Sequence, residues 1–343
     1  MRDELLGYYE RELAYLRGRG AEFARILGVG GYRPSRVVTN AEICERIDSS
    51  DEWIRERSGI ESRRWAAPDE SVIDMSVAAA GKAIAQAGIR PEQVGAILLA
   101  TVTHPLQTPS AAAAVADRLG ATDAAATDLS AACAGFCYGV SLASDMVRGG
   151  SAEHVLVIGC EKLSDFTDSY DRSTAFIFGD GAGAVVIGPS DEPAIGPTIW
   201  GSNGAEYDAI TQRASWLDVR DHQIDFPTLT MQGQKVFRWA VWQMAPVAQQ
   251  ALDAAGVKAE DLGAFIPHQA NMRITDAMIK TLKLPAHVPV ARDIRETGNT
   301  SAASIPLAME RMLESGEAKS GDTALLIGFG AGLVYAAQVV VLP

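Results

Sequence analysis

The chain has 343 residues, 48% of them apolar and 21% charged, a composition typical of soluble globular proteins. Its formal net charge of −13 argues against nucleic acid as the partner. No apolar run reaches the roughly 18 residues of a membrane-spanning helix, and no leader resembles a secretory signal, so we expect a cytoplasmic protein.

Residues 1–24 read MRDELLGYYERELAYLRGRGAEFA and predict a charged helix that two glycines interrupt. Its apolar residues at helical spacing are Leu6, Tyr9, Leu13 and Leu16. The segment resembles the start of a type VI secretion baseplate subunit. We interpret it as an N-terminal extension, and a fusion scar, a misassigned start and an interaction helix all stay open as its origin.

Two later stretches repeat each other. Residues 80–99 and 248–267 align without a gap, and Gly88 falls opposite Gly256. Each stretch predicts an Ala-rich helix that ends at a glycine, then a short acidic turn, then an apolar strand. The ungapped glycines argue against a chance similarity between two Ala-rich helices.

A second pair of similar segments follows the first. In the first half the segment begins with HVLVIGCEK at 154–162. Its counterpart in the second half is TALLIGFGAGLVYAAQVVVL at 323–342. Helices that alternate with apolar, β-branched strands predict buried, largely parallel sheets covered by helices. The chain is therefore predicted to be a duplicated α/β fold, with halves at 25–190 and 191–343.

A duplicated fold invites a site at the seam between its halves, where strand ends and helix starts converge. In DLSAACAGFCYGV at 128–140, Cys133 lies at the start of a helix predicted over 132–148. The positive end of the helix dipole is expected to lower the pKa of this thiol, and the small residues around it leave room for a substrate. Cys133 is therefore a candidate nucleophile.

The other cysteines have simpler interpretations. Cys137 lies one helical turn after Cys133 and is predicted to be a small buried hydrophobe. A disulfide between these two would strain the helix, and no His or acidic cluster accompanies them for a metal. The irregular spacing of all four cysteines, which include Cys44 and Cys160, does not predict a disulfide framework.

Two further residues follow predicted strand or turn boundaries. His268 ends the predicted strand in GAFIPHQAN, where the repeat places a strand terminus. Asn299 lies in ETGNTSAAS, a turn that opens a helix of small residues. A lone His is usually structural, and a lone Asn in a turn usually only stabilises that turn. His268 and Asn299 become candidate site residues only in combination with Cys133.

Five motifs carry a resemblance to a known family: SDEWIRERSGI, DLSAACAGF, DRSTAFIFGDGAG, IPHQAN and ETGNTSAAS. In this order and at these separations they resemble β-ketoacyl-acyl carrier protein synthase III, the initiating condensing enzyme of bacterial fatty acid synthesis. The resemblance covers about residues 25–343. It implies a thiolase-like fold of duplicated αβαβα halves, with two central mixed sheets and helices between and outside them.

The resemblance also implies a catalytic triad of Cys133, His268 and Asn299. Elongating synthases instead have a Cys-His-His triad, and degradative thiolases carry a second catalytic Cys. In the implied ping-pong reaction a short acyl-CoA acylates Cys133, and malonyl-acyl carrier protein is then decarboxylated and condensed. The backbone N–H groups of Cys133 and Ala331 would form the oxyanion hole. No metal or organic cofactor is implied, and acyl-CoA is a substrate.

The residues that resemble the family's CoA site are Trp53, Arg57, Arg172 and Asn271. Trp53 and Arg172 would sandwich the adenine, Arg57 would contact the nucleotide, and Asn271 would line the pantetheine tunnel. Without the resemblance, a core Trp and a solvated Arg would be the simpler interpretations.

Carrier proteins are acidic, so this acidic enzyme should present a basic surface beside its tunnel. Lys235, Arg238 and Arg273 resemble the family's docking positions, and exposed pairs there would steer binding more than tighten it. Thr108 stands near the position that shapes the acyl pocket across the interface of a homodimer. Its small side chain would leave room for branched or longer primers.

Two other functions compete with the initiating synthase. One is a pathway-specific homologue in polyketide or secondary metabolism that transfers or condenses acyl groups, for example onto an alcohol or amine. The intact Cys-His-Asn set favours decarboxylative condensation instead. The other is a non-catalytic partner subunit, and Cys133 argues against it because such subunits lack the nucleophile.

Overall fold

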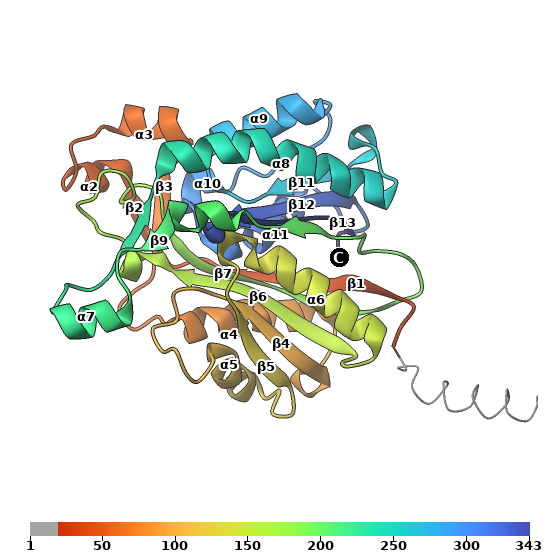
Figure 1. Ribbon diagram of the computed structural model, residues 1–343. Coiled ribbons are helices and arrows are strands. Elements are labelled where there is room, and N and C mark those ends of the chain that lie inside the picture. The colour runs from red at the N-terminus through yellow and green to blue at the C-terminus, as the bar shows by residue number, and fades with distance from the viewer. Residues whose placement is uncertain (1–19) are drawn as a thin grey trace, which may run out of the picture.

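The structure is a computed structural model that describes residues 20–343. Two sheets lie one above the other (Figure 1). The first has the order β1-β7-β6-β4-β5, with β1 at Phe23–Tyr32, β7 at Asp180–Ser190, β6 at His154–Lys162, β4 at Val94–Ala100 and β5 at Ala125–Leu129. The second has the order β11-β12-β13-β8, with β11 at Ala264–Pro267, β12 at Thr323–Gly330, β13 at Val334–Val341 and β8 at Ile199–Gly201.

Both sheets are mixed, as the family resemblance implies. β4 pairs parallel with β5 and β6, whereas β7 pairs antiparallel with β6 and β1. β11 pairs parallel with β12, whereas β13 pairs antiparallel with β12 and β8. The expectation of largely parallel sheets from strand composition alone is wrong, because β6 to β7 and β12 to β13 are joined by loops and short turns that reverse the chain.

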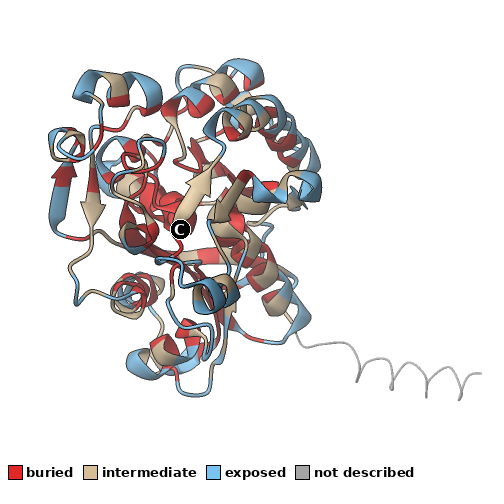
Figure 2. Cartoon of the chain, turned by 60° about the vertical axis from the view of Figure 1, so that its left-hand side comes forward, coloured by how far each residue is buried: buried red, intermediate tan, exposed pale blue. Residues whose placement is uncertain are grey.

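Helices form three layers around these sheets (Figure 1). Outside the first sheet lie α4 (Val72–Ala87) and α5 (Ala111–Leu119), and between the sheets lie α6 (Gly135–Gly149) and α11 (Ser304–Ser315). Outside the second sheet lie α8 (Gly233–Ala255) and α9 (Met272–Leu282). Figure 2 shows the buried residues gathered in the sheets and on the helix faces that meet them.

Alternation along the strands supplies the sheets with two apolar faces. Leu98 and Val157 pack into the central layer with α6, whereas Ile97 and Leu99 pack against α4 and α5. Successive strand residues point to opposite faces, so a strand buried on both faces must be apolar throughout. This accounts for the continuous apolar runs of the sequence.

The predicted repeat is present as matched local structure. α4 ends at Gly88 with φ of +68°, and α8 ends at Gly256 with φ of +66°. A left-handed residue here favours glycine, which lacks a Cβ. Each glycine leads through a 3-10 turn into a strand, β4 in the first half and β11 in the second.

The remaining helices and strands are short. After β1 come β2 (Arg36–Thr39), α2 (Asn40–Cys44), α3 (Asp51–Ser58) and β3 (Ser62–Trp65). After β8 come β9 (Ile210–Gln212), α7 (Trp216–His222) and β10 (Leu229–Met231), and α10 (Ile294–Thr297) precedes α11. No helix in the described range of 20–343 is both long enough and apolar enough to cross a membrane.

The first strand begins inside the predicted N-terminal extension. β1 starts at Phe23, where Phe23 pairs with Ser190 and Ala24 pairs with Pro189. The last two residues of the predicted extension 1–24 therefore belong to the first sheet, because the partner strand β7 continues to Ser190. The helix predicted around Leu6 to Leu16 lies outside the described residues.

Candidate active site

Cys133 lies where the two halves meet. β5 ends at Leu129, a 3-10 turn covers Ala132–Ala134, and α6 begins at Gly135. Gly330, at the end of β12 in the other half, packs directly against this turn, since a Cβ there would lie 2.9 Å from Cβ of Cys133. The helix predicted over 132–148 is thus a 3-10 turn followed by α6.

The thiol of Cys133 does not have the lowered pKa that its place before a helix predicted. Burial is the main cause that raises its pKa to about 12, the Ser301 hydroxyl beside it acts in the opposite direction, and the nearby Glu161 carboxylate contributes to the rise. Removing a thiolate from water costs more free energy than the hydrogen bond from Ser301 provides. The thiol therefore carries its proton until it reacts.

Cys137 is fully buried beneath the site. Its side chain belongs to the central apolar cluster, and burial raises its pKa to about 12. All four cysteines are free thiols. Among residues 20–343 no group of three or more His, Cys, Asp or Glu side chains could hold a metal ion.

His268 follows β11 and is held by the neighbouring strand and by α11. Its backbone N–H donates to the carbonyl of Ile327 in β12 at 2.8 Å, and its Nδ1 lies 2.7 Å from Oγ of Ser304. The ring meets Phe329 edge to face at 5.2 Å between centroids. Burial lowers the pKa of His268 to about 3, so the imidazole is neutral near pH 7.

Asn299 lies in the turn before α11. Its backbone N–H donates to the carbonyl of Ile177 at 2.9 Å, and its carbonyl accepts the N–H of Gly179 at 3.0 Å. Its Oδ1 accepts the backbone N–H of Ser301 at 2.8 Å. With Oδ1 occupied on the protein side, Nδ2 is the end of the carboxamide that is available as a donor.

One cavity brings these side chains together. Cys133, His268 and Asn299 all line a cavity of about 330 Å³, and Ala331 lines it as well. The cavity walls are largely apolar and include Phe237 and other residues from β9, β10 and α8. An apolar cleft with a few convergent polar groups is the usual form of a small-molecule site.

Sequence reasoning missed several neighbours of the triad. Ser301, Phe329 and Gly330 line the cavity, and Ser304 contacts His268. Both serines lie within the motif ETGNTSAAS, and Phe329 and Gly330 lie in the closing GFGAG segment. The motifs therefore contained the signal, but the partner of each side chain depends on tertiary packing.

The predicted adenine-binding residues lie side by side. The guanidinium carbon of Arg172 is 5.2 Å from the ring centroid of Trp53, and that of Arg57 is 5.8 Å from it. A base stacked between Trp53 and Arg172 needs about 3.5 Å on each side, roughly 7 Å in all. Arg172 must therefore move outward to admit a base.

Asn271 lines the cavity and also begins α9. Its Oδ1 accepts the backbone N–H of Arg273 at 2.9 Å, and its Nδ2 donates to the carbonyl of Arg57 at 2.9 Å. Asn271 is thus an N-cap that joins α9 to the end of α3. This fixes the cavity wall at Asn271 relative to α3.

The predicted docking residues differ in their surroundings. Lys235 forms an ion pair with Glu206, so part of its charge is already neutralised. Arg238 is exposed beside it on α8. The exposed Arg273 stacks on Phe237 with its guanidinium carbon 4.8 Å from the ring centroid. Because Phe237 lines the cavity, Arg273 marks a basic position next to it.

Thr108 does not line the cavity formed by its own chain. It is exposed in the segment between β4 and α5, whereas Val102 from the start of that segment does line the cavity. A role for Thr108 in an acyl pocket therefore depends on a second copy of the chain.

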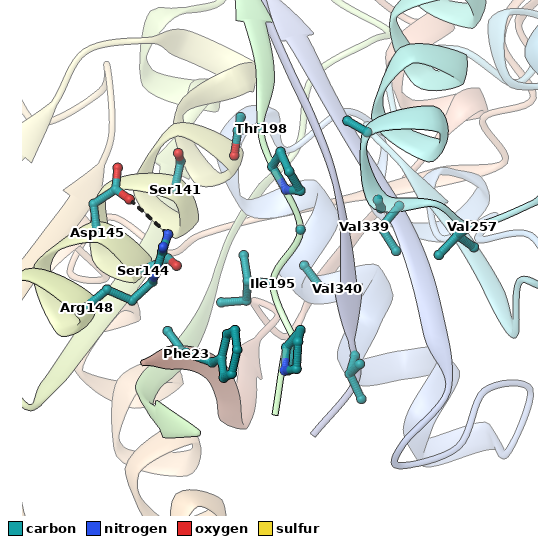
Figure 3. Close-up of a pocket in the computed structure, with 18 of the residues that line it drawn as sticks. Phe23, Ser141, Ser144, Asp145, Arg148, Ile195, Thr198, Val257, Val339 and Val340 are labelled. Carbon is teal, nitrogen blue, oxygen red and sulfur yellow. Dashed lines mark ion pairs between the residues drawn. The ribbon is translucent and has the colours of Figure 1, made fainter. Parts of the chain in front are cut away.

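A separate cavity of about 610 Å³ lies away from these residues (Figure 3). It is bordered by Phe23 at the start of β1, by α6, and by the segment that leads to β8. Asp145 and Arg148 on α6 form an ion pair of 3.9 Å at its edge. Cys133, His268 and Asn299 do not belong to its lining, so it is distinct from the candidate site.

Comparisons with known proteins agree on one family. The model of 3-oxoacyl-[acyl-carrier-protein] synthase III matches residues 127–204, and the model of its C-terminal part matches residues 252–342. A β-ketoacyl-[acyl-carrier-protein] synthase III from Streptomyces glaucescens is 67% identical over 326 residues, which cover 95% of this chain and 98% of the relative. One from Mycobacteroides abscessus is 55% identical, covering 93% and 94%.

Solved structures show the same fold. The priming β-ketosynthase of a polyketide biosynthetic pathway has a TM-score of 0.93 and 49% identity, covering 96% of this chain and 98% of that one. The 3-oxoacyl-[acyl-carrier-protein] synthase III of Aquifex aeolicus has a TM-score of 0.85 and 38% identity, covering 93% and 99%. Neither family model reaches residues 1–24, so nothing supports the baseplate resemblance of that segment.

The two packed halves and the Cys-His-Asn cavity at their seam define a condensing enzyme with a thiolase-like fold. Within that class, the chain belongs to the β-ketoacyl-[acyl-carrier-protein] synthase III family.

Proposed function

We propose that this enzyme condenses a short acyl-CoA primer with malonyl-acyl carrier protein. The products are 3-ketoacyl-acyl carrier protein, CoA and CO2, and the reaction initiates fatty acid synthesis. The observation that carries the proposal is the single cavity lined by Cys133, His268 and Asn299. Family membership supports the same reaction.

In the first half-reaction the sulfur of Cys133 attacks the acyl-CoA thioester. Because the pKa of the thiol is raised, its proton leaves as the new S–C bond forms, and it ends on the departing CoA sulfur. The negative oxygen of the tetrahedral intermediate is proposed to accept hydrogen bonds from the N–H groups of Cys133 and Ala331. Splitting the condensation into two covalent steps lowers the barrier of each.

In the second half-reaction malonyl-acyl carrier protein loses CO2, which leaves an enolate on the thioester oxygen. Nε2–H of His268 and Nδ2–H of Asn299 are proposed to donate to this oxygen. A neutral imidazole and an amide stabilise the enolate without protonating its carbon. That carbon attacks the acyl group on Cys133, and the sulfur leaves and takes up a proton.

The substrates are proposed to enter past the predicted binding residues. Trp53, Arg57 and Arg172 would hold the CoA nucleotide, and Asn271 would line the path of pantetheine. Arg238 and Arg273 would meet the acidic carrier protein, with Lys235 contributing once its ion pair with Glu206 exchanges. No organic cofactor takes part in the proposed steps, and a cytoplasmic location stays a prediction.

A homodimer is proposed as the working form. β5 is the edge strand of the first sheet and pairs with β4 on one side, so its other side offers unpaired backbone groups. Thr108 and Leu106 are exposed in the loop between β4 and α5, and the side chain of Leu106 is 58% exposed. A second copy paired along β5 would cover this edge and bring Thr108 toward the partner's cavity.

Intact-mass analysis tests the proposal directly. The enzyme is incubated with a panel of acyl-CoA esters and then with malonyl-acyl carrier protein. One acyl group should be added, and it should then be transferred to the carrier protein as a 3-ketoacyl product. A primer step in polyketide synthesis is the second candidate, favoured by the fit to the priming β-ketosynthase. It is less well supported, because that similarity is 49% against 67% for a synthase III.

A further inference from the structure

Glu161 is a buried carboxylate for which the proposed mechanism has no role. It is the second-last residue of β6 and is 0% exposed. Its Oε2 accepts hydrogen bonds from Thr101 Oγ1 at 3.2 Å, Val102 N at 3.1 Å and Thr103 Oγ1 at 2.6 Å. Its Oε1 accepts one from Ser301 Oγ at 3.1 Å. The two oxygens therefore bind two different segments of the chain.

No cation pairs with this carboxylate among residues 20–343. The neighbouring Lys162 directs its Nζ to the carbonyl of Ala67 at 3.0 Å and to Asp165. Burial raises the pKa of Glu161 to about 7, and the hydrogen bonds act against that shift. Keeping a buried carboxylate without a cation costs stability, and its hydrogen bonds offset part of that cost.

Both segments held by Glu161 border the active site. Val102 and Ser301 line the same cavity as Cys133. Three donors hold Oε2, and this leaves Oε1 directed at Ser301. In its ionised form the carboxylate is thus a fixed acceptor for one hydroxyl at the cavity wall.

Ser301 connects Glu161 to Asn299 through two hydrogen bonds. Its backbone has φ of +49°, a left-handed conformation that is costly for a residue other than glycine and that its contacts must maintain. From this conformation its N–H donates to Oδ1 of Asn299 at 2.8 Å. The hydroxyl bonded to Glu161 and the N–H bonded to Asn299 belong to the same residue.

We propose that Glu161 is a positioning residue of the condensing half-reaction, which through Ser301 holds the carboxamide of Asn299 with Nδ2 toward the malonyl thioester. This inference rests on the proposed function. Asn299 acts on the enolate and not on the acyl-CoA thioester, so a defect in its orientation affects decarboxylation and spares acylation.

Glu161→Gln in the full-length enzyme is the first test. The amide oxygen can keep the bonds to residues 101–103, but its NH2 group faces Ser301 and turns that hydroxyl from donor to acceptor. We expect kcat for decarboxylation of malonyl-acyl carrier protein to fall about tenfold, the usual effect of losing one hydrogen bond to a charged group. KM for that substrate should change less than about twofold. The rate of Cys133 acylation should not fall, because removing the Glu161 charge takes away one cause of the raised pKa of the Cys133 thiol.

Asp180→Asn is the matched control. Asp180 is a buried carboxylate on the adjacent strand β7, and burial raises its pKa to about 6. It accepts from Ser164 and from the N–H of Ala66, away from the cavity. This variant should lower thermal stability without separating the two half-reactions.

Ser301→Ala and the double variant with Glu161→Gln complete the test. If Glu161 acts through Ser301, the double variant should lose no more decarboxylation than Ser301→Ala alone. Additive losses, or an equal loss of acylation in Glu161→Gln, would show that Glu161 only supports the fold. Wild-type rates in Glu161→Gln would also overturn the inference. A wild-type enzyme that neither acylates nor decarboxylates would instead overturn the proposed function.

Discussion

The hydroxyl of Ser304 contacts the ring of His268 at Nδ1. Its Oγ lies 2.7 Å from Nδ1 of His268 and also accepts the backbone N–H of Gln269 at 3.3 Å. We propose that Ser304 donates its own proton to Nδ1, because the second half-reaction needs Nε2 of His268 as a donor. A neutral ring that accepts at Nδ1 carries its proton on Nε2. This is the donor that the second half-reaction requires.

The first prediction concerns the charge state of His268. Because burial lowers its pKa from 6.5 to about 3, the ring should stay neutral and protonated at Nε2 from pH 8 down to pH 5. Nitrogen-detected NMR should show no titration of the His268 ring in this range, its signal being identified by its absence in His268→Gln. A ring at His268 that takes up a proton near pH 6.5 would contradict the prediction. Ser304→Ala should release the tautomer and slow decarboxylation about tenfold.

The second prediction separates two neighbouring cysteines. An acyl-CoA should add one acyl group to the wild type and to Cys137→Ala, and none to Cys133→Ala, because only Cys133 lines the cavity whereas Cys137 is fully buried. Intact-mass analysis reads the result directly. Cys137→Ala should lose stability, since it removes a buried side chain from the central cluster. Acylation that persists in Cys133→Ala would refute the nucleophile.

The third prediction separates the half-reactions. His268→Ala and Asn299→Ala should still acylate Cys133, yet decarboxylate malonyl-acyl carrier protein on the order of 10²-fold more slowly, the usual effect of removing an oxyanion donor. Release of labelled CO2 measures the second step, and intact mass measures the first. A variant that releases CO2 at the wild-type rate would have no role in stabilising the enolate.

Local signals made much of the fold predictable. The repeat could be recognised because Gly88 and Gly256 must end their helices in a left-handed conformation, which only local chemistry decides. The direction of β7 and β13 could not be read from apolar runs, because a strand buried on both faces has the same composition in either direction.

The site was predictable in its residues and not in its electrostatics. Motifs placed Cys133, His268 and Asn299, and the structure brings all three to one cavity. The raised pKa of Cys133 depends on how completely other elements cover it, which no local pattern records. Glu161 and Ser301 are 140 positions apart in the sequence, so their contact required the fold.

The fourth prediction concerns the basic surface beside the cavity. Arg238→Glu and Arg273→Glu should raise KM for malonyl-acyl carrier protein and weaken its dependence on salt, with acylation by CoA esters nearly unchanged. Lys235→Glu should have a smaller effect, because Lys235 already pairs with Glu206. Steady-state kinetics at several salt concentrations measure all three. Equal damage to both substrates would show that these residues support the cavity wall.

The start of the described chain is attached to the body of the enzyme. Gly20 packs so closely on α6 that a Cβ there would lie 1.9 Å from the carbonyl oxygen of Arg148, and the N–H of Ala21 donates to the carbonyl of Val147 at 3.2 Å. Phe23 and Ala24 then pair with β7. These contacts begin at Gly20, within the extension that the sequence predicted to end at residue 24.

The fifth prediction follows from this boundary. Deleting residues 2–19 should leave kcat within about twofold and Tm within a few degrees, as for a dispensable terminus. Deleting residues 2–24 should lower Tm further, because it removes the first two residues of β1 and the contacts of Gly20 and Ala21 with α6. Calorimetry measures Tm, kinetics measure kcat, and size-exclusion chromatography measures the oligomeric state of both variants. A large loss of stability, or of the proposed dimer, on deletion of residues 2–19 alone would show that the segment packs on the enzyme.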